Sequence, residues 1–158
     1  ALFAEARVIP VLTIERVADA VPLARALVAG GVRVLEVTLR TPAAVEAAKA
    51  IMAEVPDAVV GIGTILNADD LTRAEKLGAR FGISPGATSD LLEAAADSAL
   101  PFAPGIATAS ELMAALANGF GFAKFFPAEQ AGGIMLLFLI SLFCLRFALL
   151  LNISLNLL

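Results

Sequence analysis

Six short apolar runs alternate with helix-like segments along residues 8–127, and this repeat constrains the fold more than any other feature of the chain. The runs are rich in β-branched residues, and the segments between them carry apolar residues at helical spacing. We expect strands at residues 8–13, 32–39, 59–66, 80–84, 101–106 and 122–126, and helices at 14–29, 42–54, 67–77, 88–97 and 108–118. Strict βα alternation of this kind predicts parallel strands joined by helical crossovers.

The connections favour a barrel over an open nucleotide-binding sheet. The first strand is not followed by the G-x-G-x-x-G pattern of a dinucleotide-binding fold. We therefore predict the α/β class and the (β/α)8 TIM-barrel family. Such barrels usually need at least ~200 residues, so 158 residues with six strand signals predict an incomplete barrel. Thr13 and Thr41 are expected to cap the first two helices, and Gly78 to end the third.

The C-terminal part of the chain, residues 134–158, differs from the barrel-like part, residues 1–133. Of 26 charged residues, only Arg146 follows Gly133. Residues 134–151 hold thirteen Leu, Ile and Phe residues, enough by composition for a membrane span. Two other interpretations are a segment that packs over the incomplete barrel or aggregates, and a foreign sequence joined by a frameshift or gene fusion. The abrupt change in composition favours the foreign origin.

The residue types present exclude several kinds of chemistry. The chain has no histidine, so it lacks the usual general base and the commonest metal ligand. Cys144 is the single cysteine, which permits no intrachain disulfide and no cysteine metal site. A net charge of −4 without any basic cluster argues against nucleic acid as a partner. We expect no metal, no cofactor and a cytoplasmic location, with membrane association through the tail as the alternative.

Lys124 is the candidate nucleophile. It lies within the apolar, aromatic run Phe122–Glu129. Burial of an ammonium group in apolar surroundings disfavours its charged form, and a neutral amine can attack a carbonyl to form a Schiff base. The alternative is a lysine whose stem crosses apolar surface while its head reaches water. The local sequence does not separate these two interpretations.

Glu36 and Arg40 are expected on one face of the second strand, because side chains alternate along a strand. A carboxylate inside a central parallel strand is costly unless it is paired or functional. Arg40 stands at the carboxyl end of that strand, where barrel enzymes place their chemistry. A purely structural ion pair of Glu36 with Arg40 or Lys124 is the alternative.

Thr64 ends the third strand, directly after Gly61 and Gly63. The two glycines would let a ligand approach the backbone closely, whereas the threonine hydroxyl could equally cap the next helix. Taken together, the candidate residues suggest one chemistry. An amine attacks a ketone, a carboxylate moves protons, and an arginine holds an anionic group such as a carboxylate through two hydrogen bonds.

Five motifs in this order resemble the 2-keto-3-deoxy-6-phosphogluconate aldolases, class I aldolases that include 4-hydroxy-2-oxoglutarate aldolase activity. The resemblance covers about residues 8–133. The motifs are Glu36-Val-Thr-Leu-Arg40-Thr, Gly61-Ile-Gly-Thr64, Ile83-Ser-Pro-Gly86, Pro104-Gly-Ile-Ala-Thr108 and Phe122-Ala-Lys124-Phe-Phe-Pro-Ala-Glu129.

This resemblance implies a homotrimeric (β/α)8 lyase that cleaves 2-keto-3-deoxy-6-phosphogluconate to pyruvate and glyceraldehyde 3-phosphate. Lys124 matches the Schiff-base lysine, and Glu36 the general acid and base. Arg40 and Thr64, together with Lys124, match the substrate-binding residues. The family continues after Gly133 with two further strands whose glycine-rich loops hold the substrate phosphate. The sequence therefore predicts a truncated or chimeric member that keeps the pyruvate half of the site, or an inactive remnant whose tail inserts in membrane or aggregates.

Overall fold

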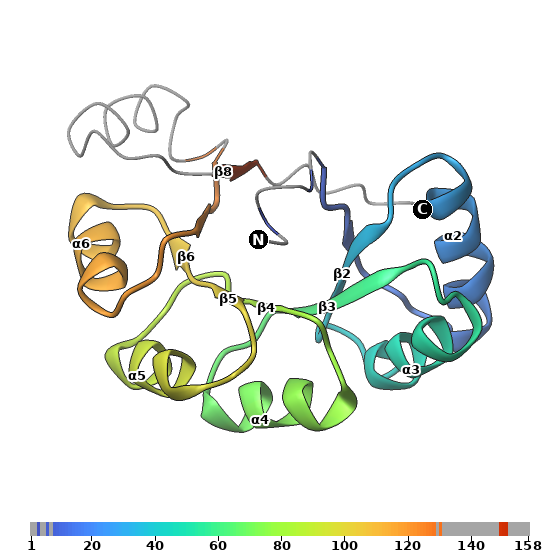
Figure 1. The fold of residues 1–158 in the computed structure, drawn as a ribbon, viewed down its shortest axis with the longest axis horizontal. Coiled ribbons are helices and arrows are strands. Elements are labelled where there is room, and N and C mark those ends of the chain that lie inside the picture. Colours follow the sequence, from blue (N-terminus) through green and yellow to red (C-terminus); the bar gives the residue numbers. More distant parts are fainter. Residues whose placement is uncertain (1–2, 4–5, 7, 129, 131–148, 152–158) are drawn as a thin grey trace.

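The strands line the inside of an open arc and the helices cover its outside (Figure 1). The computed structural model describes residues 3, 6, 8–128, 130 and 149–151. Its elements are β1 (Val11–Leu12), α2 (Val17–Ala29), β2 (Val34–Thr38), α3 (Ala44–Glu54), β3 (Val59–Gly63), α4 (Ala68–Leu77), β4 (Gly82–Ile83), α5 (Ser89–Asp97), β5 (Phe102–Ala103), β6 (Gly105–Ile106), α6 (Ala109–Ala117), β7 (Ala123–Phe125) and β8 (Leu149–Leu151).

All strand pairs are parallel, as the βα alternation predicts. One sheet has the order β1-β2-β3-β4-β5, and a second has the order β6-β7-β8. The predicted strand at residues 101–106 is two short strands with Pro104 between them. Proline has no N–H to donate to a ladder, but its carbonyl still accepts from Lys124 N at 2.8 Å. Pro104 thereby links the fifth strand position to β7.

The outward face of the strands carries the main hydrophobic core. Leu35, Val37 and Ile62 are fully buried there against small residues of the covering helices. Alanines at positions such as Ala24 and Ala47 are also fully buried, and small side chains let a helix approach a sheet closely. Burial of this apolar face against helices is what holds a parallel sheet together.

The inward face is apolar near the amino ends of the strands. There the Phe3 ring lies 5.4 Å from the Phe81 ring and 5.6 Å from the Phe122 ring, centroid to centroid. Phe3 and Phe81 form one buried cluster with Ile83 and Ala103, and the partly buried Phe122 packs against it. This aromatic cluster fills the interior near the amino ends of the strands, and the polar residues of the inward face lie nearer the carboxyl ends.

Helix ends follow the sequence at some positions and depart from it at others. Gly78 ends α4 in the left-handed conformation, as predicted. Thr41 does not cap α3, whose N-cap is Ala43, because its hydroxyl donates to the Ile14 carbonyl at 2.6 Å. Thr13 does not cap α2 either, since that helix begins after Arg16. Its hydroxyl lies 3.3 Å from the Thr38 hydroxyl instead.

The predicted C-terminal tail, residues 134–158, lies outside the described residues except for β8. This strand pairs with β7 in parallel register, with Lys124 opposite Leu150. The predicted membrane span at residues 134–151 is likewise outside the description apart from those three residues. In the part of the chain that is described, no helix has the length and apolar character needed to cross a membrane. The boundary at Gly133 stays a prediction.

Candidate active site

Two charged side chains meet inside the sheet. Lys124 comes from the middle of β7 and Glu36 from the middle of β2, although 88 residues separate them in the chain. The Lys124 Nζ donates to Glu36 Oε1 at 3.1 Å and lies 3.4 Å from Oε2. Their side chains are only 4% and 3% exposed, so neither charge is solvated by bulk water. The pair provides an amine and a proton carrier in direct contact.

Burial controls the proton affinity of the Glu36 carboxyl. Loss of hydration raises the pKa of Glu36 above its ordinary value of 4.5, and this effect outweighs the opposing charges of Lys124 and Arg40. A carboxyl group with a raised pKa holds a proton at a higher pH than an exposed glutamate does. Such a shift suits a carboxyl group to proton transfer, because it accepts a proton more readily than an exposed glutamate does.

The surroundings of Lys124 match the first of the two interpretations of its sequence context. Its residue is 3% exposed, so its head does not reach water as a surface lysine would. The Nζ lies 5.3 Å from the centroid of the Phe126 ring. The buried amine thus lies near an aromatic ring and in hydrogen-bond contact with a carboxyl group.

Arg40 and Thr64 lie just beyond the carboxyl ends of two neighbouring strands, β2 and β3. Arg40 is exposed, and among the described residues no ion pair joins it to a carboxylate. Glu36 thus pairs with Lys124 and not with Arg40. The Arg40 guanidinium still influences the carboxyl group, because its charge lowers the pKa of Glu36 in part.

Thr64 has an unusual backbone conformation. Its φ is 61°, in the left-handed region that β-branched residues rarely adopt. It does not cap α4, because Asn67 is the N-cap and accepts from Asp70 N at 2.9 Å. Strained backbone of this type clusters at binding and catalytic sites. The capping alternative for Thr64 is therefore wrong, and its role in ligand binding stays a prediction.

Ser84 is a buried polar residue whose structural role the sequence did not reveal. Its hydroxyl oxygen accepts from Gly105 N at 3.1 Å and so ties the end of β4 to β6. The signal in the sequence was a serine at the end of an apolar strand, but its partner is 21 residues away. Ser84 therefore joins the chain just after β4 to the start of β6.

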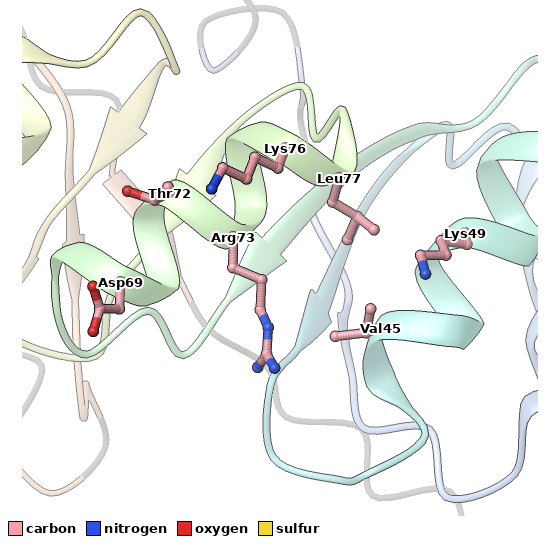
Figure 2. Close-up of a pocket in the computed structure, with 7 residues that line it drawn as sticks. All are labelled: Val45, Lys49, Asp69, Thr72, Arg73, Lys76 and Leu77. Atoms are coloured by element: carbon pink, nitrogen blue, oxygen red, sulfur yellow. The ribbon is translucent and has the colours of Figure 1, made fainter.

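A surface hollow of about 400 Å³ lies elsewhere, between α3 and α4 on the outside of the sheet (Figure 2). It is lined by Val45, Lys49, Asp69, Thr72, Arg73, Lys76 and Leu77. All its charged residues are exposed, and Lys49 already donates to Glu46 Oε1 at 2.7 Å. Within the described ranges, no three His, Cys, Asp or Glu side chains gather as ligands for a metal ion. The buried pair, and not this hollow, is the candidate site.

Comparisons with known proteins agree with the motifs. A family model described as KDPG and KHG aldolase matches residues 1–145. The chain is 54% identical over 133 residues to a 2-dehydro-3-deoxy-phosphogluconate aldolase of Pseudoalteromonas atlantica, and 54% identical over 127 residues to the KHG/KDPG aldolase of Escherichia coli. These matches cover 84% and 80% of the chain but 62% and 60% of the relatives. The chain thus spans about three fifths of their length.

Solved structures show the same fold. The 2-keto-3-deoxy-6-phosphogluconate aldolase of Zymomonas mobilis with 3-phosphoglycerate is 50% identical, with a TM-score of 0.90 over 97% of the chain and 74% of that structure. A Legionella pneumophila KDPG aldolase, captured with pyruvate as a covalent carbinolamine, is 47% identical, with a TM-score of 0.88 over 93% of the chain and 72% of that structure. The predicted α/β class and TIM-barrel family are confirmed. With its family model, its relatives and its fold in agreement, the chain belongs to the KDPG and KHG aldolase family.

Proposed function

We propose that the chain is a class I aldolase that cleaves 2-keto-3-deoxy-6-phosphogluconate to pyruvate and glyceraldehyde 3-phosphate through a Schiff base on Lys124. The observation that carries the proposal is the buried contact of Lys124 Nζ with Glu36 at 3.1 Å. The names of the relatives and the carbinolamine captured in the Legionella pneumophila enzyme support it. The buried amine supplies a nucleophile and the carboxyl group supplies the proton transfers.

The proton movements follow from this contact. Glu36 takes a proton from the amine, and the neutral Nζ attacks the ketone carbon of the substrate. Glu36 then protonates the carbinolamine oxygen, which leaves as water and yields a protonated imine. Glu36 takes the proton of the C4 hydroxyl group, the C3–C4 bond breaks to release glyceraldehyde 3-phosphate, and the electron pair of that bond moves into the imine to form an enamine. Protonation of the enamine at C3 and hydrolysis release pyruvate and restore Lys124.

Arg40 and Thr64 would hold the carboxylate end of the substrate beyond the carboxyl ends of β2 and β3. The guanidinium of Arg40 can bind a carboxylate through two parallel hydrogen bonds. Thr64 lies at the end of the neighbouring strand, directly after Gly63. Anchoring the carboxylate at these two residues would orient the ketone carbon toward the interior amine. Lys124 would itself bind substrate covalently.

The resemblance of the five motifs also leads us to propose a cytoplasmic homotrimer. Sedimentation velocity of the purified protein measures the oligomeric state directly. A species of three chains supports the assembly, and a stable monomer contradicts it. The assembly and the chemistry are separate proposals, because both members of the candidate pair come from one chain.

Pyruvate release measured with 2-keto-3-deoxy-6-phosphogluconate and with 4-hydroxy-2-oxoglutarate tests the proposed activity. We expect Lys124→Arg to abolish release and the matched exposed substitution Lys49→Arg to leave it unchanged. A guanidinium cannot form the imine, but it preserves the positive charge. Retention of pyruvate release in Lys124→Arg would contradict the proposal.

A further inference from the structure

The inward face of β3 lacks side chains where the reactive pair lies. Gly61 and Gly63 occupy successive inward positions on this strand, since side chains alternate. Their sequence pattern suggested space for a ligand beside the backbone. The structure shows instead that atoms of the protein itself occupy the space above both glycines.

Gly63 faces the carboxyl group of Glu36. A Cβ atom on Gly63 would lie 2.1 Å from Glu36 Oε1 and 2.7 Å from Glu36 Cγ and Cδ, well inside the 3.0 Å limit of real Cβ contacts. The φ of Gly63 is outside the left-handed range, so backbone conformation does not require glycine there. Only the space taken by Glu36 requires it.

Glu36 is therefore confined on two sides. The backbone of Gly63 limits one side, and Lys124 Nζ receives the carboxyl oxygens on the other at 3.1 and 3.4 Å. We infer that Gly63 is a positioning residue that fixes the Glu36 carboxyl group against Lys124 and so sets the geometry of proton transfer. This inference rests on the proposed function for its catalytic consequence, but its structural part stands independently of any activity.

Gly61 provides a matched control on the same strand and the same face. A Cβ atom there would lie 2.2 Å from the Phe81 ring, a conflict as close as the one at Gly63. Phe81 is fully buried in the apolar cluster with Phe3. Alanine at either position should therefore overpack the interior, but only alanine at Gly63 should displace the carboxyl group.

A double-mutant cycle tests the structural part. Gly63→Ala should lower the melting temperature by roughly 2–12 °C through overpacking. Glu36→Ala removes the conflicting carboxyl group, so Gly63→Ala combined with Glu36→Ala should melt at a higher temperature than the sum of the single effects predicts. The changes in melting temperature caused by Gly61→Ala and Glu36→Ala should be additive when the two substitutions are combined. If Gly63→Ala yields no folded protein, the double variant should recover a larger soluble fraction. Additivity, or no better recovery, would overturn the inference.

Kinetics test the catalytic part. A displacement of about 1 Å in a reacting group costs on the order of 10²-fold in rate. We expect Gly63→Ala to lower kcat for pyruvate release about 10²-fold with KM little changed, and Gly61→Ala to change kcat far less. Equal kcat losses in the two variants would overturn the positioning role. If the wild-type chain releases no pyruvate, the proposed function fails, and the stability cycle still decides whether Gly63 makes room for Glu36.

Discussion

Two Lys–Glu pairs, one inside the sheet and one on the helical surface, show how burial changes the meaning of the same contact. Lys49 and Glu46 on α3 lie 2.7 Å apart with side chains 53% and 62% exposed. Lys124 and Glu36 lie 3.1 Å apart with side chains 4% and 3% exposed. The surface pair has the shorter contact of the two, yet only its lysine, Lys49, lines the open hollow between α3 and α4 (Figure 2).

The difference is one of hydration. An exposed pair keeps most of its water and is typically worth about 0.2–1 kcal/mol. A buried pair loses several kcal/mol of hydration per ion, which its mutual attraction only partly repays. The interior pair is thus not explained by a contribution to stability alone. The proposed Schiff-base chemistry, which requires an amine and a carboxyl group in contact, would explain such a pair inside the sheet.

Removal of one interior partner should produce the largest change. Lys124→Met leaves Glu36 buried without its partner, and we expect the free energy of unfolding to fall by about 3–5 kcal/mol. Urea denaturation measures this loss. The matched surface change, Lys49→Met, should cost no more than about 1 kcal/mol. Similar losses of unfolding free energy for the two lysines would contradict the claim that burial distinguishes the two pairs.

Removal of both interior partners should have the opposite effect on stability. Glu36→Met combined with Lys124→Met replaces the ion pair with apolar side chains of similar size. We expect the double variant to be about as stable as the wild type or more stable by about 1–4 kcal/mol, while it releases no pyruvate. A double variant less stable than Lys124→Met alone would show that the interior pair serves stability.

Interior and surface carboxyl groups should respond to pH in opposite directions. Burial raises the pKa of Glu36 against the opposing charges of Lys124 and Arg40. The contribution of Glu36 to folding stability is therefore complete below about pH 4.5, the ordinary pKa, and is lost as pH rises through the pKa of the folded state. Glu36→Gln should remove this loss. Urea midpoints measured from about pH 4 upward, compared between wild type and variant, check this expectation. Parallel pH curves would contradict it.

The exposed Glu111 supplies the contrast. Partial burial acts to raise its pKa, but hydrogen bonds from Ala107 N, the Thr108 hydroxyl and Thr108 N outweigh it and lower the pKa. Its contribution is present above about pH 4.5 and is lost as pH falls through its folded-state pKa. Glu111→Gln should flatten the acid side of the urea-midpoint curve only. A change in the slope of the curve above neutral pH, as distinct from a constant offset, would contradict this assignment.

The smallest effect is expected at the surface pair. Lys49→Gln should lower the free energy of unfolding by about 0.2–1 kcal/mol, and added salt should shrink the difference further because exposed charges are screened. Urea titrations at low and high salt measure both quantities. A larger or salt-independent loss would mean that the Lys49–Glu46 pair contributes more to stability than its exposure implies.

The sequence predicted element order and type well, because apolar periodicity is a local property. It placed Gly78 correctly but not the roles of Thr13 and Thr41, since their hydroxyls bond to residues about 25 positions away in the chain. It also left Glu36 with two possible partners. Choice of Lys124 over Arg40 depends on how β2 and β7 face each other across the arc, which no local pattern contains.

Comparison of lysine reactivity inside and outside the sheet tests most directly whether the buried amine of Lys124 is the Schiff-base nucleophile. The protein is incubated with pyruvate and borohydride, and the peptides that carry Lys124, Lys49 and Lys76 are compared by mass spectrometry. We predict a three-carbon adduct on Lys124 and none on the two lysines of the outer hollow. Folded protein without an adduct on Lys124, or with equal labelling of Lys49 and Lys76, would contradict the claim that the buried amine is the Schiff-base nucleophile.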